Sequence, residues 1–255
     1  MPIIIEKAYP IYTIIIDNPD VRNAIDGLSA LELANAFRNF EEDKNALIAV
    51  LWGSGGTFCS GANLKAILSD ERNKVQKKGN GPMGPTRMQL TKPVIAAVAG
   101  HAVAGGLELA LWCDLRVVEK SVVLGVFCRR FGVPLIDGGT VRLPRLIGLS
   151  RAMDMILTGR AVNADEAFQW GLANRIVEDG TSRQESELLA QEIAKFPQTC
   201  MKNDRLSAYT QIGLPLKKAM MKEFQYGLNT LKSGEYLDGS KAFTKGYGKH
   251  GKFNN

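Results

Sequence analysis

The stretch PVIAAVAGHAVAGGLELALWCDL, residues 93–115, decides the fold of this chain. It is the most apolar run of the sequence, and it predicts a strand buried on both faces over residues 92–100. Two adjacent glycines, Gly105 and Gly106, then lead into a helical stretch that carries a carboxylate, Glu108. A charged side chain would be costly in lipid, which argues against a membrane span. A carboxylate in so apolar a segment makes Glu108 the first candidate for a functional residue.

The segments on either side of this run alternate strands, glycine-rich loops and helices. Residues 3–17 predict a β-hairpin of β-branched residues, and Asp26 can cap a helix whose apolar residues recur at helical spacing. Residues 46–53 are another continuous apolar run, which leads into the glycine-rich loop GSGGTFCSGANLKAI. The order of strand, glycine-rich loop and helix therefore occurs twice. This weak internal repeat favours stacked β-β-α turns over a plain doubly wound sheet.

A loop and a run of helices complete the chain. Residues 69–90 are polar and rich in glycine and proline, which is typical of a mobile surface loop. From residue 150 the pattern is helical, with Ser150 and Asn163 as helix N-caps. No strand is expected after about residue 178. The fold class is therefore α/β with a helical C-terminal region.

Composition and charge bound the class of protein. The chain has 255 residues, of which 45% are hydrophobic and 23% charged, as in ordinary globular proteins. Its four cysteines form no C-x-x-C pair and are expected to be reduced thiols, and two histidines argue against a transition-metal site. The N-terminus shows no secretory signal, so a cytoplasmic location is expected. From Met201 onward ten Lys or Arg accompany four Asp or Glu, and this basic segment suits either an anionic ligand or a solvated helix face.

The glycine-rich loops match no familiar phosphate-binding or nucleophile motif. In the first loop, Gly53 and Gly55 are followed by Phe58 where a G-x-G-x-x-G would have its third glycine, and the sequence has no G-x-x-x-x-G-K-[ST] and no G-x-S-x-G. The segments SGANL and AGGLEL can supply backbone N–H groups at the start of a helical stretch, where such donors lack partners. Two loops of this kind that converge on one point would form an oxyanion hole. The alternative is that the glycines only permit tight turns.

Three long motifs in a fixed order extend this interpretation. The segments FCSGANLKAI, KPVIAAVAGHAVAGGLELALWCDLRVV and GGTVRLPRLIG resemble those of the crotonase (enoyl-CoA hydratase/isomerase) superfamily. The resemblance covers nearly the whole chain. It implies a crotonase-like spiral core of β-β-α turns over residues 1–195 and a helical C-terminal trimerisation region over residues 196–255. It also implies a homotrimer or dimer of trimers that acts on acyl-CoA thioesters, with no membrane and no cofactor beyond the coenzyme A of the substrate.

The resemblance assigns roles to individual residues. The backbone N–H groups of Ala62 and Gly105 would form the oxyanion hole for the thioester carbonyl, and Glu108 would act as acid and base. A carbonyl that accepts two hydrogen bonds stabilises an enolate, and an apolar site raises the pKa of a carboxylate toward a useful range. The alternative for Glu108 is a structural ion pair. The residues implied for the coenzyme A channel are Arg22, Asn23, Ala24, Asn63, Leu64 and Lys65, with Lys249 and Lys252 for the 3′-phospho-ADP group.

Two positions depart from the pattern of the family. Asn63 replaces the aspartate that usually follows the oxyanion alanine. Cys128 stands where the hydratases place a second catalytic glutamate. A thiol can replace that group only if its pKa is lowered, which the neighbouring Arg129 and Arg130 would do. Asp137 is a further candidate for a catalytic second carboxylate, and the alternative is that it bonds the backbone of a turn.

Three functions remain open at this point. The first is hydration of a trans-2-enoyl-CoA to a 3-hydroxyacyl-CoA. The second keeps the fold and changes the reaction to double-bond isomerisation, hydrolysis or decarboxylation of an acyl-CoA, because the second glutamate is missing. The third is binding of a nucleic acid, RNA, through the lysines. It is disfavoured because the basic segment lacks interleaved aromatic residues.

Overall fold

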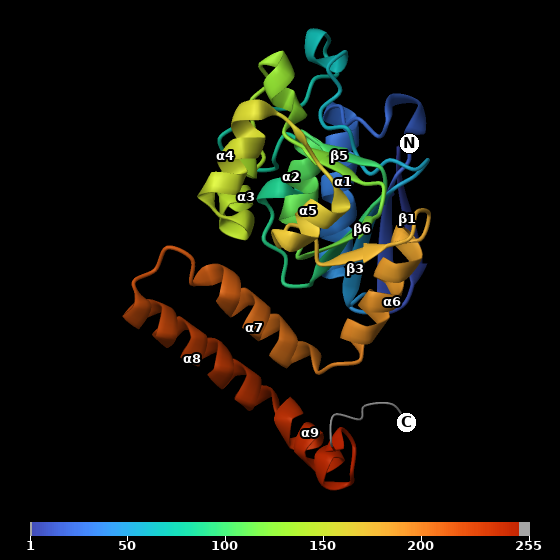
Figure 1. Cartoon of the computed structure of the whole chain (residues 1–255). Helices are drawn as coiled ribbons and strands as arrows, with labels where there is room; N and C mark the ends of the chain where they lie inside the picture. Colours follow the sequence, from blue (N-terminus) through green and yellow to red (C-terminus); the bar gives the residue numbers. More distant parts are fainter. Residues whose placement is uncertain (1, 250–255) are drawn as a thin grey trace. The chain divides into compact units, whose positions relative to one another are not determined.

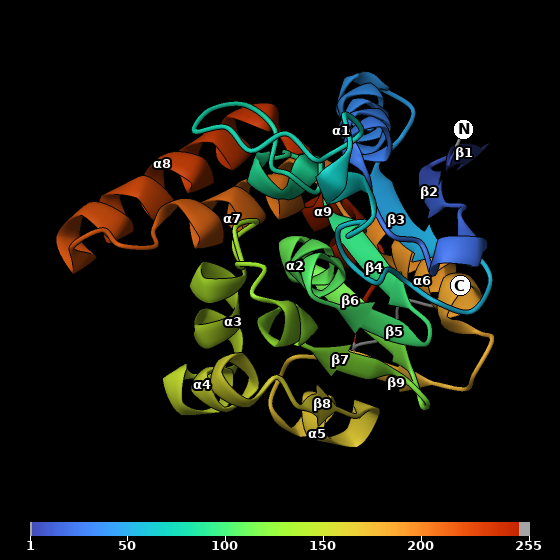
Figure 2. The same cartoon turned by 90° about the horizontal axis from the view of Figure 1, so that it is seen from above.

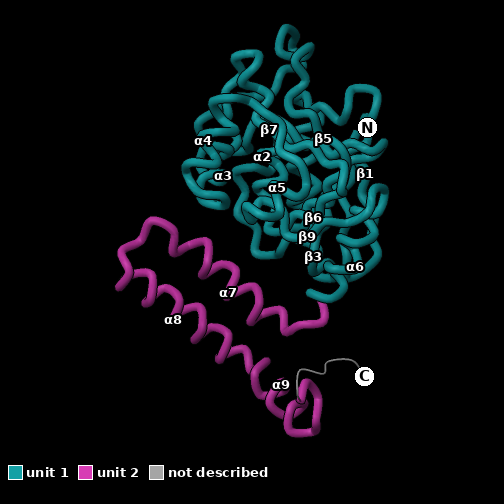
Figure 3. Tube along the Cα trace, in the orientation of Figure 1, with its two compact units in different colours: residues 1–193 teal, residues 194–255 magenta. Residues whose placement is uncertain are grey.

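The structure is a computed structural model that describes residues 2–249. The chain divides into two compact units, one ending at Ile193 and the other beginning at Ala194 (Figure 3). Each unit is described by itself. Lys252, one of the two lysines expected to contact the nucleotide of coenzyme A, lies outside the described residues.

A six-stranded sheet forms the centre of the first unit (Figure 1). Its strands, in spatial order, are β1 (Ile3–Ala8), β2 (Ile11–Ile16), β3 (Ile48–Gly53), β4 (Val94–Val98), β6 (Leu115–Glu119) and β9 (Arg175–Val177). β1 and β2 are antiparallel and form the expected hairpin, whereas the remaining neighbours are parallel. β2, β3 and β4 are almost entirely buried, which is why their sequences are continuous apolar runs rather than alternating patterns.

The central apolar run continues into a second, smaller sheet. The strands of this sheet are β5 (His101–Val103), β7 (Val123–Gly125) and β8 (Ala161–Val162). The strand expected over residues 92–100 is shorter than predicted, because the chain turns between the sheets at Gly100 with a φ of 51°. A side chain at Gly100 would lie 2.2 Å from the carbonyl oxygen of Gly56, so the turn requires glycine. β4, β5 and the helix that follows them make one β-β-α turn, which confirms the predicted spiral (Figure 2).

Helices surround these sheets. The α-helices are α1 (Gly27–Glu42), α2 (Gly105–Trp112), α3 (Gly139–Ile147), α4 (Leu149–Thr158), α5 (Ala164–Gln169) and α6 (Ser182–Ala194). Short 3₁₀ helices are η1 (Pro19–Val21), η2 (Ala66–Leu68), η3 (Pro85–Arg87) and η4 (Phe127–Phe131). Asp26 and Asn163 cap α1 and α5 as expected, by accepting a hydrogen bond from a backbone N–H. Ser150 is not an N-cap, because α4 begins one residue earlier, directly after the Gly148 that also ends α3.

Part of the segment expected to be a mobile loop is tightly packed. Gly81 and Gly84 form an antiparallel bridge in which each N–H donates to the carbonyl of the other, at 3.0 and 2.9 Å. Met83 and Thr86, on either side of Gly84, are both 1% exposed. The expectation of a mobile loop over residues 69–90 is therefore wrong for residues 81–86. Contacts with distant parts of the chain fix this segment, although its composition is typical of a mobile loop.

The second unit is helical, as expected. It contains α7 (Gln198–Thr210), α8 (Leu216–Ser233) and α9 (Glu235–Thr244). The carboxylate of Glu235 accepts hydrogen bonds from the N–H groups of Thr199 and Cys200, which are orphan donors in the first turn of α7. The role of this second unit in trimerisation stays a prediction. None of the helices within residues 2–249 combines the length and the apolar character that a membrane span needs.

Candidate active site

The loop after β3 holds a backbone N–H group without a partner. The N–H of Ile25 donates to the carbonyl of Gly61 at 2.8 Å, and the N–H of Asn63 donates to the carbonyl of Ile25 at 2.8 Å. Ala62 lies between these two bonds and pairs with Ile25 as a parallel bridge. Within residues 2–249, the N–H of Ala62 itself donates to no acceptor. The loop is therefore fixed while this one donor stays free.

A second free N–H belongs to Gly105, at the start of α2. The preceding residue, Ala104, has φ 54° and ψ −125°, which is a strained backbone for a residue with a side chain, and its own N–H is held by the carbonyl of Gly125 at 2.9 Å. No described residue accepts a hydrogen bond from the N–H of Gly105. A first-turn helix donor lies at the positive end of the helix dipole, so this group suits a negatively charged oxygen.

The two loops touch each other at their glycines. A side chain at Gly61 would lie 3.0 Å from the backbone nitrogen of Gly105, and one at Gly106 would lie 2.0 Å from the carbonyl oxygen of Cys59. The N–H of Val103 also donates to that Cys59 carbonyl at 3.1 Å. The glycines therefore do more than permit turns, because they let the two loops that carry the free donors approach each other closely.

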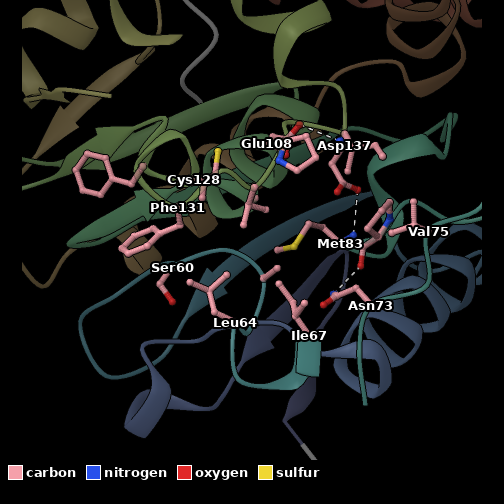
Figure 4. A pocket seen from close by; sticks show the side chains of 18 of the residues that line it. Ser60, Leu64, Ile67, Asn73, Val75, Met83, Glu108, Cys128, Phe131 and Asp137 are labelled. Carbon is pink, nitrogen blue, oxygen red and sulfur yellow. Dashed lines mark hydrogen bonds between the residues drawn. The ribbon is translucent and has the colours of Figure 1, made fainter. Parts of the chain in front are cut away.

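Ala62 and Gly105 line one cavity of about 470 Å³. Figure 4 shows this cavity with Met83, Glu108 and Asp137 among its labelled side chains. Its other lining residues are Ser60, Leu64, Ile67, Arg72, Asn73, Val75, Pro82, Met83, Ala104, Glu108, Phe127, Cys128, Phe131, Gly132, Val133, Pro134, Ile136 and Asp137. Most of the wall is apolar, and two carboxyl groups, Glu108 and Asp137, contribute to it. A mainly apolar cavity with a few convergent polar groups is the usual form of a small-molecule site.

Glu108 is buried in the first turn of α2, and its carboxyl group is held from one side. Its Oε1 accepts hydrogen bonds from the N–H of Asp137 at 2.9 Å and of Gly139 at 2.7 Å. Burial raises the pKa of Glu108 to about 7, the bond from Gly139 opposes this effect, and the charge of Asp137 adds to it. The backbone of Ile136 also lowers the pKa of Glu108, and neither of the bonds from Asp137 and Gly139 goes to Oε2. The group can take up or release a proton near neutral pH at that oxygen.

Asp137 is buried beside Glu108, and its side chain points to a different segment. Oδ1 accepts hydrogen bonds from the N–H of Met83 at 3.0 Å and from the hydroxyl of Thr86. Burial raises the pKa of Asp137, and these two hydrogen bonds oppose the effect. Asp137 thus joins the loop before α3 to the turn that carries Met83, while its backbone N–H holds Glu108.

Comparisons with known proteins identify the family of this chain. The family model described as Enoyl-CoA hydratase/isomerase matches residues 6–245. This chain belongs to the enoyl-CoA hydratase/isomerase family. It is 36% identical to a carnitinyl-CoA dehydratase of Salmonella typhi over 186 residues, which cover 72% of this chain and 71% of that protein. A carnitinyl-CoA dehydratase of Proteus mirabilis is 36% identical over 183 residues, or 71% of this chain and 70% of that protein.

Solved structures of the family share the fold over almost the whole chain. An enoyl-CoA hydratase of Mycobacterium tuberculosis H37Rv superposes with a TM-score of 0.91 at 31% identity, covering 96% of both chains. An enoyl-CoA hydratase of Bacillus anthracis gives a TM-score of 0.84 at 28% identity, with the same coverage. The crotonase fold predicted from the sequence is thereby confirmed.

The structure overturns the expectation that two arginines lower the pKa of Cys128. The side chain of Arg129 donates to the carbonyl of Ile156 at 3.1 Å, and that of Arg130 to the carbonyl of Gly159 at 2.7 Å. These two cations therefore bind carbonyl groups at the C-terminal end of α4, where the helix dipole is negative. Burial raises the pKa of Cys128, the charge of Glu108 raises it further, and Arg129 only partly opposes this. Cys128 lines the cavity as a neutral thiol.

The residues expected along the coenzyme A channel have different surroundings. Asn23 is fully buried, and its side chain bonds the N–H of Asn18 and the carbonyls of Ser54 and Thr57, so it braces three loop segments and is closed to a ligand. Ala24 is also buried, whereas Arg22 is exposed with a left-handed φ of 54°. Asn23 and Ala24 thus pack inside the protein, where they support the loop after β2 and are not exposed to a ligand.

The loop after Ala62 divides its residues between the cavity and the surface. Leu64 lines the cavity. The side chain of Asn63 accepts the N–H of Lys65 at 3.1 Å, which is a local turn contact, and Lys65 is exposed. Lys249 is exposed in the second unit.

Within residues 2–249 no cluster of His, Cys, Asp and Glu has the arrangement of a metal site.

Sequence reasoning missed the contribution of the segment between Asn73 and Thr86. Met83 lines the cavity, and its sulfur lies 2.7 Å from the position that a side-chain carbon on Gly105 would occupy. The signal that points to this role is the pair of glycines, Gly81 and Gly84, that bracket a two-residue turn. A short spacing of this kind marks a turn but does not show which cavity the turn faces.

Proposed function

We propose that this chain catalyses the reversible hydration of a trans-2-enoyl-CoA to a 3-hydroxyacyl-CoA. The observation that carries the proposal is the buried carboxyl of Glu108, with a pKa of about 7, in a cavity also lined by Ala62 and Gly105, whose backbone N–H groups are free. Membership of the enoyl-CoA hydratase/isomerase family supports an acyl-CoA substrate. Relatives named enoyl-CoA hydratase and carnitinyl-CoA dehydratase support addition and removal of water.

The two N–H groups would bind the thioester oxygen. When water adds to the β-carbon, the electrons of the C=C bond move toward the carbonyl, and negative charge accumulates on that oxygen as an enolate. Donors from Ala62 and Gly105 stabilise this charge, and the removal of one such donor typically costs about 10²–10³ in turnover. Because both loops are held by their own hydrogen bonds, the donors need little rearrangement when the charge develops.

Glu108 would move the proton. As the oxygen of water bonds the β-carbon, Oε2 of the carboxylate accepts a proton from that water. The same proton then passes from Glu108 to the α-carbon of the enolate, which restores the carboxylate and completes the addition of H and OH. A pKa near neutral pH suits both steps, since one group must accept and then donate.

We infer that Asp137 positions Glu108 and adjusts its pKa. The backbone N–H of Asp137 fixes Oε1 of Glu108, and its charge raises the pKa of Glu108. Its own Oδ1 is already occupied by Met83 and Thr86. This role needs no second proton-transfer group, which agrees with the neutral thiol of Cys128 at the other candidate position.

A double-bond isomerase is the second candidate. The observation that favours it is Cys128, a neutral thiol at the position where hydratases are expected to have a second catalytic glutamate, while Glu108 alone can move a proton between two carbons of a 3-enoyl-CoA. Purified enzyme offered a trans-2-enoyl-CoA and a 3-enoyl-CoA of equal length distinguishes the two. Formation of 3-hydroxyacyl-CoA from the 2-enoyl ester supports hydration. Conversion of the 3-enoyl ester to the 2-enoyl ester, without formation of the alcohol, would replace it by isomerisation.

We also propose that the chain assembles as a homotrimer or a dimer of trimers. The second unit supports this, because α8 exposes large apolar side chains that a folded chain normally covers. These are Leu216, Met220, Met221, Phe224 and Leu231. Light scattering of wild type and of Phe224→Asp tests the proposal: wild type should have the mass of three or six chains, and the variant a lower mass. A wild-type mass of one chain would overturn it.

Contact of Lys249 with the nucleotide of coenzyme A stays a proposal, supported by its exposed positive charge. Lys249→Glu should raise KM for an enoyl-CoA and leave KM unchanged for the corresponding pantetheine thioester, which lacks the nucleotide. The same increase for both thioesters would exclude this contact.

A cytoplasmic location also stays a proposal, supported by free cysteines that suit a reducing compartment.

A further inference from the structure

Met83 is presented to the cavity by a turn that is held on several sides. The paired hydrogen bonds between Gly81 and Gly84 close a turn with Pro82 and Met83 at its tip, and both tip residues line the cavity. The carbonyl of Pro82 accepts a hydrogen bond from the side chain of Asn73 at 2.9 Å. A side chain at Gly84 would lie 2.5 Å from the carbonyl oxygen of Ala30, so the turn also sits directly against α1.

The turn is fastened to the loop that holds Glu108. Asp137 accepts the N–H of Met83 at 3.0 Å and the hydroxyl of Thr86. Arg142, in the first turns of α3, donates to the carbonyl of Thr86 at 2.6 Å and to the carbonyl of Asp137 at 2.8 Å. Since Asp137 also donates its N–H to Glu108, the position of Met83 is tied to that of the acid/base.

Met83 lies where it would meet the acyl group. Its sulfur is 2.7 Å from the position of a side-chain carbon on Gly105, so it packs directly against this glycine of the cavity wall, whose N–H is free. A thioester bound at that N–H would place its first acyl carbons beside the side chain of Met83. The same wall contains further apolar side chains, among them Ile67, Val75 and Ile136.

The cavity is poorly suited to a cationic acyl group. Recognition of a quaternary ammonium normally uses several aromatic faces. Two phenylalanines line the wall, but the guanidinium of Arg130 already lies 3.8 Å from the ring centre of Phe127, and Phe131 is 69% exposed. A positively charged side chain, Arg72, is itself part of the wall. A trimethylammonium group, as in carnitine, would therefore meet one positive charge and no aromatic cage.

We propose that Met83 selects the acyl group, and that the group selected is uncharged, apolar and longer than butyryl. This inference rests on the proposed hydration of acyl-CoA thioesters. The thioether of methionine is flexible and adapts to a chain that passes it, whereas a rigid side chain at the same place would block a long chain. The apolar side chains of the cavity wall give such a chain a favourable surface, which a four-carbon acyl group would leave partly uncovered.

The experiment measures dehydration, the reverse reaction, of three esters of coenzyme A: 3-hydroxyoctanoyl-CoA, 3-hydroxybutyryl-CoA and carnitinyl-CoA. The variants are Met83→Phe, whose larger and more rigid side chain fills part of the cavity, and Met83→Leu, which nearly conserves the volume of the side chain. Met155→Leu in α4 is the matched control, because Met155 is equally buried but does not line the cavity. Thermal unfolding of each variant accompanies the kinetics.

The wild type should prefer 3-hydroxyoctanoyl-CoA to each of the other two esters in kcat/KM by about tenfold or more, a ratio within reach of apolar contacts. Met83→Phe should lose about tenfold or more on the octanoyl ester and change much less on the butyryl ester. Met83→Leu and Met155→Leu should keep the wild-type ratios.

Three results overturn parts of the account separately. Equal losses on both chain lengths in Met83→Phe would show that Met83 does not select the acyl group. A wild-type preference for butyryl or carnitinyl ester would exclude the proposed acyl class and leave the reaction intact. Wild-type enzyme that dehydrates none of the three esters would instead overturn the proposed function.

Discussion

The backbone N–H of Asp137 donates a 2.9 Å hydrogen bond to Oε1 of Glu108, while the charge of the Asp137 carboxylate raises the pKa of that same group. One residue therefore fixes the orientation of the acid/base and increases its affinity for a proton. Burial is the larger cause of the raised pKa, and Asp137 adds to it.

Glu108→Gln should stabilise the folded protein at pH 8. The pKa of Glu108 rises from an ordinary carboxyl value to about 7 on folding, so between these values the folded state binds more protons than the unfolded state, and stability falls as pH rises. The cost at pH 8 is on the order of 3 kcal/mol. The amide of glutamine removes it and can still accept the two backbone N–H groups. Thermal unfolding at pH 8 and pH 4.5 measures this, and an equal or lower Tm for the variant at pH 8 would contradict it.

The pH dependence of wild type should show an acidic limb near neutral pH. Glu108 must be ionised to accept a proton, so kcat/KM should fall as pH decreases through the pKa of about 7. In Asp137→Asn the charge that raises this pKa is absent, so the limb should move to lower pH. Asparagine can still accept the bonds from Met83 and Thr86, which keeps the geometry.

The size of the loss in Asp137→Asn distinguishes positioning from catalysis. If Asp137 only positions and tunes Glu108, kcat at pH 8 should change by less than about tenfold. A loss of about 10²–10⁴, typical of an acid/base group, would make Asp137 a second proton-transfer residue. Full pH profiles of kcat and kcat/KM for both proteins provide the measurement.

Much of the fold could be predicted because its determinants are local. Continuous apolar runs predict buried parallel strands, and Asp26 caps α1 as its sequence position indicates. The surroundings of Cys128 could not be predicted, because Arg129 and Arg130 bond carbonyls at the end of α4 instead of the thiol beside them. The role of Met83 was equally hidden, since its contact with Gly105 depends on how distant segments pack.

Cys128→Ala should retain activity within about threefold of wild type. Burial and the charge of Glu108 keep the thiol neutral, so it cannot act as a base at neutral pH. Initial rates on one enoyl-CoA at pH 8 test this directly. A loss greater than about tenfold in a variant with wild-type Tm would instead assign chemistry to the thiol.

Gly105→Pro should lower kcat by about 10²–10³, because it removes one of the two free donors. Proline is tolerated at the first position of a helix, where Gly105 lies, so α2 should persist. Gly105→Ala is the control: it keeps the N–H, presses on the flexible side chain of Met83, and should lose less. Greater loss in the alanine variant would mean that packing, not the donor, limits the reaction.

The most direct test of the central claim is hydration of a trans-2-enoyl-CoA in D₂O by wild type and by Glu108→Gln, with the product analysed by NMR. If Glu108 carries the proton of water to the α-carbon, wild type should place one deuterium at that carbon, and the variant should lose activity by about 10²–10⁴ because its amide cannot transfer a proton. A folded Glu108→Gln enzyme that retains more than about a tenth of wild-type turnover would contradict the account.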